Sequence, residues 1–382
     1  MNEFLFKVDV DGHCWLDDHT LKISQSVWLN GMPEAELLER AMIIKEEAEA
    51  SQIYNKGYFG TPQSGGALKL ELVEGIFLSE SGRIDVKKKG RRMTFPQLLH
   101  VANNIHPNFG IKYLVYRDLR LRGYVVKPCV DPLDFRVFPR GGSPSKTPSK
   151  YWVSALSERS IFDLKELRKH LSKAMQVKKE LLLAVVDEES DLTYYLARVV
   201  KPKGKRGKKR KKPKAHSLLL EDRVMVMDEQ EARALYEHGF YGKMIGSRLQ
   251  LSLIETAYLL EKGMIEVKNA KTGRRIGLHS FLKKARKIQP DFGLRLKVFR
   301  DLEDKGVIVK TGFKYGSHFR AYTMDPHKAH AKYLVHAFSA GHKGMWPEVS
   351  RAVRVSHGVK KDILFGMVGK EIEYVALKRV RP

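Results

Sequence analysis

The sequence is short of cysteine and of long apolar runs, and each shortage excludes a class of protein. Its 382 residues hold only Cys14 and Cys129, which lie far apart without Cys or His at metal-ligand spacing. A disulfide framework and a zinc finger are therefore not expected. No stretch approaches the roughly 18 apolar residues of a membrane-spanning helix, and residues 1–15 lack the layout of a secretory signal. We expect a soluble, cytoplasmic protein without a membrane partner.

Acidic residues are also scarce relative to basic ones. Lys and Arg number 70 against 44 Asp and Glu, which gives a net charge of +26 and a pI of about 9.8. This excess goes beyond what solubility requires and predicts a polyanionic partner, with nucleic acid preferred over an anionic membrane. Hydrophobic residues make up 43% of the chain, enough for the cores of about two to four domains.

The chain contains an internal duplication. Residues 54–60, YNKGYFG, correspond to residues 236–242, YEHGFYG, and residues 108–127 correspond to residues 291–310. An offset of about 183 residues is too long for a solenoid repeat. The chain therefore consists of two copies of one unit.

Each copy changes character once, from short alternating runs mixed with helical stretches to a helix followed by β-branched strands. This predicts an α+β fold in tandem duplication, each repeat an N-terminal α+β domain followed by an α/β domain with a mixed central sheet. The predicted boundaries are residues 1–95 and 96–200 for the domains of repeat 1, 201–216 for a basic linker, and 217–290 and 291–382 for the domains of repeat 2.

Two irregular segments interrupt this pattern. Residues 201–214 include ten Lys or Arg and no large apolar residue, so we expect a solvated linker. The linker is either only flexible or also grips phosphates non-specifically, and the two roles are compatible. Residues 139–150, rich in Ser, Pro and Gly, interrupt only the first copy and predict a loop.

Three polar residues of the second copy have no counterpart in the first. They are Tyr315, His330 and Arg354, opposite which the first copy has Asp131 or Pro132, then Pro148 and Ser172. Lys361 is retained in the first copy as Lys179. This divergence predicts one active and one supporting copy.

These residue types suit metal-free cleavage of RNA. Attack by the 2′-hydroxyl on its own phosphodiester needs a base, an acid for the departing 5′-oxygen and a cation for the charge on the phosphoryl oxygens. A histidine can serve as acid near pH 7. A tyrosine can serve as base where cations stabilise its phenolate, for which Lys314 and Lys361 are candidates. From residue types alone, a structural Tyr, a surface His and a solvated Lys remain the alternative.

Three ordered motifs carry a family resemblance. They are RDLxxxGxxVKTGxKYGxxFRxY at residues 300–322, HxxYLV at 330–335 and VRVxHxVKK at 353–361. The second copy resembles the archaeal tRNA-splicing endonuclease (tRNA-intron endonuclease) family, in the form with two fused repeats, and the resemblance covers nearly the whole chain. It implies a nuclease-like fold for the second domain of each repeat.

The resemblance also implies a function. It is excision of introns from precursor tRNA at bulge–helix–bulge sites, by transesterification that needs no metal or other cofactor and leaves 2′,3′-cyclic phosphate and 5′-hydroxyl ends. It implies Tyr315 as general base, His330 as general acid and Lys361 as stabiliser of the transition state. The alternatives are His318, His327 and His336 for the acid and Lys360 for the cation.

Two arginines are implied as the RNA-binding pair that holds a flipped-out bulge base, namely Arg354 and Arg379. A guanidinium plane stacks on any base and so requires no sequence code. Lys378 and Arg381 are alternatives to Arg379, whose other interpretation is a surface arginine that contacts phosphate.

An acidic loop distinguishes the first copy from the second. It contains Asp187, Glu188, Glu189 and Asp191. One interpretation is a solvated hairpin turn. The other, implied by the resemblance, is an assembly loop that inserts into a basic pocket of a catalytic unit, which predicts a homodimer.

Two other functions account for part of the sequence. A metal-dependent nuclease needs converging carboxylates, and near the last strands the second copy offers only Asp362, Glu371 and Glu373. A non-catalytic RNA-binding protein accounts for the charge but not for the set of Tyr315, His330 and Lys361. The loop at 139–150 is a further candidate for phosphate contacts that broaden the substrate range.

Overall fold

The computed structural model describes residues 7–8, 14–15, 31–129, 132–205 and 212–382. Most of the N-terminal segment considered above, Asp131, and the centre of the basic linker lie outside the described residues. The chain forms two compact units. One comprises residues 1–160, 174–195 and 380–382, and the other comprises residues 161–173 and 196–379.

The N-terminal domain occurs twice with the same element order. In repeat 1 it contains β3 (Glu34–Leu37), β4 (Ala41–Ile44), α1 (Glu47–Asn55), β5 (Thr61–Pro62), β6 (Leu68–Glu71), α2 (Leu72–Glu80), β7 (Asp85–Lys88), β8 (Arg91–Arg92) and α3 (Phe95–Ile105). In repeat 2 it contains β15 (Ala215–Leu219), β16 (Val224–Val226), α6 (Glu229–Gly239), β17 (Lys243–Ile245), β18 (Arg248–Leu251), α7 (Leu253–Glu261), β19 (Ile265–Asn269), β20 (Arg275–Ile276) and α8 (Leu278–Ile288). The sheet orders, β5-β6-β4-β3-β7-β8 and β17-β18-β16-β15-β19-β20, are equivalent strand for strand.

The second domain also occurs twice. In repeat 1 it contains α4 (Phe109–Leu121), β9 (Val126–Pro128), β10 (Phe135–Val137), β11 (Tyr151–Ser157), β12 (Ile161–Asp163), α5 (Leu164–Gln176), β13 (Glu180–Val186) and β14 (Leu192–Val200). In repeat 2 it contains α9 (Phe292–Asp304), β21 (Ile308–Thr311), the 3₁₀ turn η2 (Phe313–Tyr315), β22 (Phe319–Tyr322), β23 (Tyr333–Ser339), β24 (Lys343–Met345), α10 (Trp346–Gly358), β25 (Asp362–Val368) and β26 (Ile372–Val380). The remaining strands are β1 (Lys7–Val8) and β2 (Cys14–Trp15).

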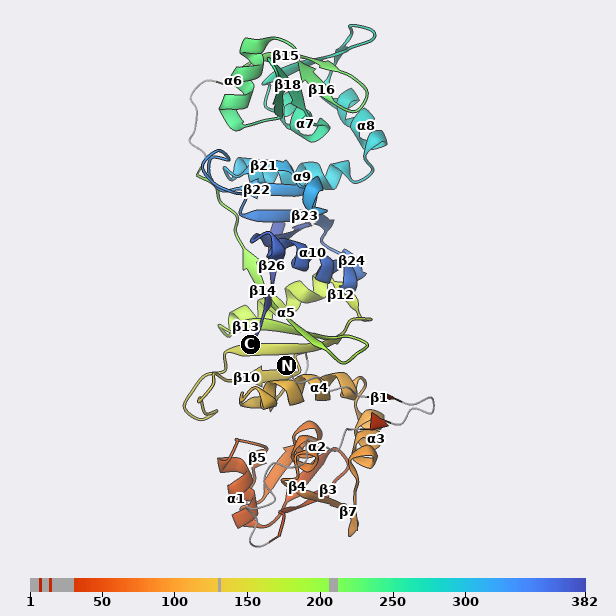
Figure 1. Cartoon of the computed structure of the whole chain (residues 1–382), viewed down its shortest axis with the longest axis vertical. Coiled ribbons are helices and arrows are strands. Elements are labelled where there is room, and N and C mark those ends of the chain that lie inside the picture. The colour runs from red at the N-terminus through yellow and green to blue at the C-terminus, as the bar shows by residue number, and fades with distance from the viewer. Residues whose placement is uncertain (1–6, 9–13, 16–30, 130–131, 206–211) are drawn as a thin grey trace. The chain divides into compact units, whose positions relative to one another are not determined.

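In repeat 2 the strands follow the order β21-β22-β23-β25-β26. Strand β23 is parallel to β25, whereas its pairing with β22 is antiparallel, so the sheet is mixed. Strand β25 is apolar and buried after its first residue, as expected for a strand covered on both faces. Helix α9 packs along β21 and β23 (Figure 1). The predicted α+β fold in two repeats is confirmed.

A short segment of repeat 1 belongs to the second unit. Strand β12 pairs antiparallel with β24, and the Phe162 ring packs edge-on against Trp346 at 5.2 Å between ring centres. Arg168 donates two hydrogen bonds to the Glu373 carboxylate, at 2.9 and 2.6 Å. This bidentate geometry favours one orientation of the two side chains.

The basic linker differs from expectation at its start. Pro202 is buried, and the backbone N–H groups of Gly204 and Lys205 donate to the carbonyls of Lys305 and Thr323 at 3.0 and 2.8 Å. The expectation of a fully solvated linker is therefore wrong for residues 201–205. Glycine and proline reduce the bulk of this stretch, so its backbone can pack while the lysine side chains stay outside.

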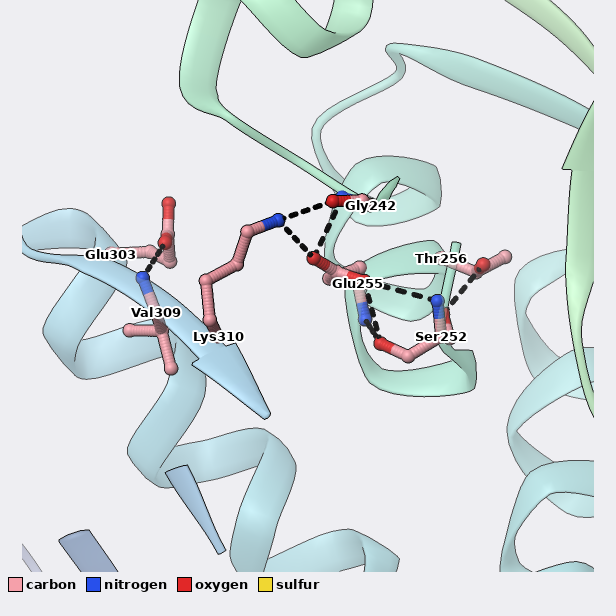
Figure 2. Close-up of polar contacts among 7 residues, drawn as sticks. All are labelled: Gly242, Ser252, Glu255, Thr256, Glu303, Val309 and Lys310. Atoms are coloured by element: carbon pink, nitrogen blue, oxygen red, sulfur yellow. Dashed lines mark hydrogen bonds and ion pairs between the residues drawn. The ribbon is translucent and has the colours of Figure 1, made fainter. Parts of the chain in front are cut away.

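An ion pair between a half-buried lysine and a buried glutamate joins the two domains of repeat 2 (Figure 2). The ammonium of Lys310, on β21, donates to the Gly242 carbonyl at 2.6 Å and lies 3.3 Å from Glu255 on α7. Glu255 also accepts hydrogen bonds from the backbone N–H groups of Gly242 and Ser252 and from the Ser252 hydroxyl. This arrangement, the Lys310 latch, satisfies a buried carboxylate from both domains at once.

Repeat 1 contains the equivalent latch. The Lys127 ammonium donates to the Gly60 carbonyl and lies 3.5 Å from buried Glu74. Burial raises the pKa of Glu74 above its usual value despite Lys127. Burial also acts to raise the pKa of Glu255, but Lys310 and the hydrogen bonds outweigh it and the pKa is lowered. The Lys310 latch of repeat 2 therefore holds its carboxylate, Glu255, more firmly in the charged form than the latch of repeat 1 holds Glu74.

Replacement of Lys310 with Met should destabilise repeat 2 by about 3–5 kcal/mol, because it leaves a buried carboxylate without its cation. Urea unfolding at pH 7.5 measures the change. Lys271→Met, which removes an exposed pair 4.0 Å from Glu221, is the control and should cost less than about 1 kcal/mol. Equal effects of the two substitutions would contradict a role for the latch.

Candidate active site

Tyr315 lies in the tight connection between β21 and β22. Its backbone N–H donates to the Gly312 carbonyl at 2.8 Å, and Gly316 follows with a φ of 62° in the left-handed region. The buried Ser317 hydroxyl is within hydrogen-bond distance of the Gly312 and Phe319 carbonyls. A side chain at residue 312 would collide with Ser317. The sequence GFKYGS thus specifies a defined turn, and the turn fixes the position of Tyr315.

Lys361 immediately precedes β25. Lys360 ends the α10 connection with a φ of 53°, and the Lys361 N–H donates to the Ser356 carbonyl at 2.9 Å. The Lys361 ammonium donates to the Val359 carbonyl at 3.1 Å and lies 5.5 Å from the centre of the Tyr315 ring. This distance is within the range of a cation–π contact, so the structure brings the predicted base and the predicted cation together.

His330 is exposed in the β22–β23 loop, three residues before β23. The loop ends are fixed, because the Lys332 N–H donates to the Ala321 carbonyl and the Asp362 N–H donates to the Lys332 carbonyl, both at 3.0 Å. Since β23 and β25 are parallel neighbours, His330 and Lys361 both precede the starts of adjacent strands. Among the described residues, Tyr315 and Lys361 are in contact with each other, but no such contact joins either of them to His330.

The alternative histidines are engaged in packing. His318 accepts a hydrogen bond from the Ala337 N–H at 2.9 Å, and its ring centre lies 5.3 Å from that of His336. Burial, with Arg295 and His336, lowers the pKa of His318 to about 4. Burial and Arg295 lower the pKa of His336 to about 4. Both rings are therefore neutral at pH 7, whereas His327 lies against Tyr236, with its Nε2 3.3 Å from the hydroxyl.

The RNA-binding candidates lie on separate elements of the same unit. Arg354 is exposed on α10, and Arg379 is exposed near the end of β26. One exposed aromatic residue of this unit, Phe313, is not among the candidates from the sequence. It lies two residues before Tyr315 in the same turn and is 87% exposed. The signal in the sequence was an aromatic residue inside a Gly-bounded turn, where no partner strand covers it.

The acidic loop is a β13–β14 hairpin turn in the first unit. Asp187 accepts hydrogen bonds from the N–H groups of Glu189 and Asp191 at 3.0 and 2.9 Å, so it stabilises the turn itself. Glu188 pairs with Arg159 at 2.6 Å. Glu189 and Asp191 are exposed.

Within the described ranges, no group of three or more His, Cys, Asp or Glu residues is arranged to hold a metal ion. Every helix described is too short or too polar to cross a bilayer.

Comparison with known proteins identifies both domain types. The tRNA intron endonuclease N-terminal domain matches residues 33–99 and 215–282, and the tRNA intron endonuclease catalytic C-terminal domain matches residues 109–194 and 292–374. Each repeat therefore contains the N-terminal and the catalytic domain of one endonuclease family, in that order. The chain belongs to the tRNA intron endonuclease family, and the predicted form with two fused repeats is confirmed.

Relatives agree over nearly their full length. The tRNA-splicing endonuclease of Methanococcoides burtonii is 40% identical over 357 residues, which cover 91% of this chain and 99% of the relative. That of Methanosarcina mazei is 39% identical and covers 89% of this chain and 96% of the relative. That of Halobacterium salinarum is 31% identical, with 86% and 93% covered. The chain is thus an enzyme of this family.

The neutral histidines predict a loss of stability in acid. The unfolded chain protonates both rings near pH 6.5, whereas the folded chain does so only near pH 4. The unfolded state therefore binds more protons in this interval, and stability should fall by a few kcal/mol as the pH is lowered from about 6.5 to 4. Urea midpoints across this range measure the fall. His336→Phe should reduce the slope, and an unchanged slope would contradict the assignment.

Proposed function

We propose that this protein excises introns from precursor tRNA by cutting at bulge–helix–bulge sites through metal-independent transesterification. The observation that carries the proposal is the Lys361 ammonium 5.5 Å from the Tyr315 ring centre, in the repeat that also supplies His330. The family membership and the net charge of +26 support an RNA substrate.

The reaction assigns one role to each side chain. Tyr315, as phenolate, takes the proton of the 2′-hydroxyl while that oxygen attacks the adjacent phosphorus. The bond from phosphorus to the 5′-oxygen breaks, and His330 gives its proton to the departing oxygen. Lys361 offsets the charge that grows on the phosphoryl oxygens. The products are a 2′,3′-cyclic phosphate and a 5′-hydroxyl.

Binding and assembly complete the proposal. Arg354 and Arg379 hold an unpaired bulge base by stacking. Lysines of the linker contact phosphates of the RNA. The hydrogen bond from the Lys205 N–H to the Thr323 carbonyl supports this role, because it holds the start of the linker beside the loop that carries His330. The chain acts in the cytoplasm as a homodimer in which the acidic loop of one copy enters a basic pocket of the other. The domains of this enzyme are those predicted above, residues 1–95 and 96–200 in repeat 1 and residues 217–290 and 291–382 in repeat 2.

Single-turnover cleavage of a bulge–helix–bulge precursor in excess EDTA tests the catalytic roles. Tyr315→Phe, His330→Ala and Lys361→Ala should each lower the rate by about 10²- to 10⁴-fold, because each removes a proton carrier or the stabilising charge. Lys179→Ala, at the matching position of repeat 1, should leave the rate unchanged.

Mapping of the product ends decides the reaction type. Cyclic phosphate and 5′-hydroxyl ends are expected. Cleavage abolished by EDTA, or 5′-phosphate ends, would replace this mechanism with metal-dependent hydrolysis. Full activity of Tyr315→Phe and His330→Ala would show that the site lies elsewhere.

Assembly is tested by charge reversal in the acidic loop. The double substitution Glu189→Lys/Asp191→Lys should convert dimer to monomer in sedimentation velocity at 150 mM salt and reduce cleavage in parallel, because it places cations against a basic pocket. These two positions spare Asp187, which the turn needs. Glu371→Lys, in the corresponding loop of repeat 2, is the control and should remain dimeric. A double variant that sediments as the wild type would contradict the assembly role.

A further inference from the structure

A cavity of about 630 Å³ lies in repeat 2 between α6, the β17–β18 hairpin and the loop that carries His330. Its wall includes Arg233 and Tyr236 from α6, Phe240 directly after it, Met244 from β17 and His327 from the loop. We call it the ring cavity, because three aromatic rings form much of its wall. All of these residues belong to the second unit.

The three rings form one cluster. The Tyr236 and Phe240 ring centres are 5.9 Å apart, and His327 lies 6.2 Å from Tyr236 and 5.6 Å from Phe240. The His327 Nε2 is 3.3 Å from the Tyr236 hydroxyl. Rings in this arrangement, open to solvent on one side, suit stacking against another flat group.

The ring cavity lies against the loop that carries the candidate catalytic acid, and His327 of that loop is part of its wall. Phe240 packs against a small cluster of Ile308, Tyr322 and Ala331, and Ala331 immediately follows His330. Phe240 has a φ of 59°, a left-handed conformation that is rare for a bulky side chain and costs on the order of 1–3 kcal/mol. Phe240 adopts this conformation directly after the end of α6, and its ring packs against Ala331 of the β22–β23 loop.

Repeat 1 keeps only part of this arrangement. Tyr54 and Tyr58 correspond to Tyr236 and Phe240, with ring centres 5.7 Å apart, and Tyr58 has a φ of 56°. In the register of Arg233, however, repeat 1 has Ser51. Repeat 1 therefore supplies a matched aromatic pair that is not beside a candidate catalytic histidine.

We propose that the ring cavity binds the base of the nucleotide on the 3′ side of the scissile phosphate. This inference rests on the proposed function, in which His330 protonates the 5′-oxygen of that nucleotide. The leaving nucleotide is therefore the part of the RNA that lies nearest the β22–β23 loop. Aromatic side chains stack on any base without a sequence requirement, and the cavity is large enough for one. Arg233, whose side chain is 65% exposed and pairs with Glu229 at 2.7 Å, lies at the rim.

Precursor RNAs with and without a base at this nucleotide test the inference. On wild-type protein, removal of the base should lower kcat/KM by roughly 5- to 100-fold, the effect of losing one stacked base. The variant Tyr236→Leu/His327→Ala should lose a similar factor on intact RNA and show no further loss on the abasic RNA. Tyr54→Leu, the matched control in repeat 1, should behave as the wild type on both.

Fluorescence gives a readout that does not require cleavage. The base is replaced by 2-aminopurine and the attacking 2′-hydroxyl by hydrogen, so the RNA binds but is not cut. Wild type and Tyr54→Leu should quench the fluorophore by stacking, and Tyr236→Leu/His327→Ala should not. The single variant His327→Ala, at an exposed position, should show intermediate quenching and guards against misfolding of the double variant.

The outcomes separate the two proposals. If the abasic penalty and the quenching are the same in wild type and variant, the inference is wrong while the proposed function stands. If quenching follows the prediction but no precursor is cleaved, the ring cavity binds a base and the proposed function is wrong. If the variant changes only the sedimentation coefficient, the cavity is a protein contact and the inference is overturned.

Discussion

The arrangement of each repeat depends on one half-buried lysine that serves two domains. Lys310 neutralises Glu255 and binds the Gly242 carbonyl, while its own strand leads within five residues to Tyr315. An unpaired carboxylate at this depth would cost several kcal/mol, so the N-terminal domain is held in one position against the turn that carries Tyr315. This constraint also places α6 and Phe240 beside the loop that carries His330.

Duplication keeps this frame and frees the polar positions that do not support it. Lys127 and Glu74 repeat the latch in the first copy, and the six-stranded sheets match strand for strand. The polar residues of the candidate active site belong to the second copy, and the acidic turn belongs to the first. Two copies with one architecture can therefore carry different polar side chains, because most of these positions lie outside the Lys–Glu pairs and the sheets that hold the fold.

Packing separates the histidines near the site by their protonation. His318 and His336 lie within a cluster of rings where burial keeps them neutral at pH 7. His327 and His330 lie in the outer loop, one against the rings of α6 and one exposed to solvent. Four histidines within twenty residues thus occupy three environments, and only the environment distinguishes a packing ring from a candidate proton donor.

The duplication, the α+β class and the family follow from the sequence alone, because apolar periodicity and three ordered motifs are local patterns that survive divergence. The sequence also pointed to Tyr315 and Lys361, whose motifs specify a turn and a strand start. It could not show that Lys310 binds Glu255, that residues 201–205 pack, or that Phe240 adjoins Ala331. Those contacts join residues from 55 to more than 100 positions apart. They depend on the folded arrangement, since burial and distance arise when separate elements come together and leave no periodic trace in the chain.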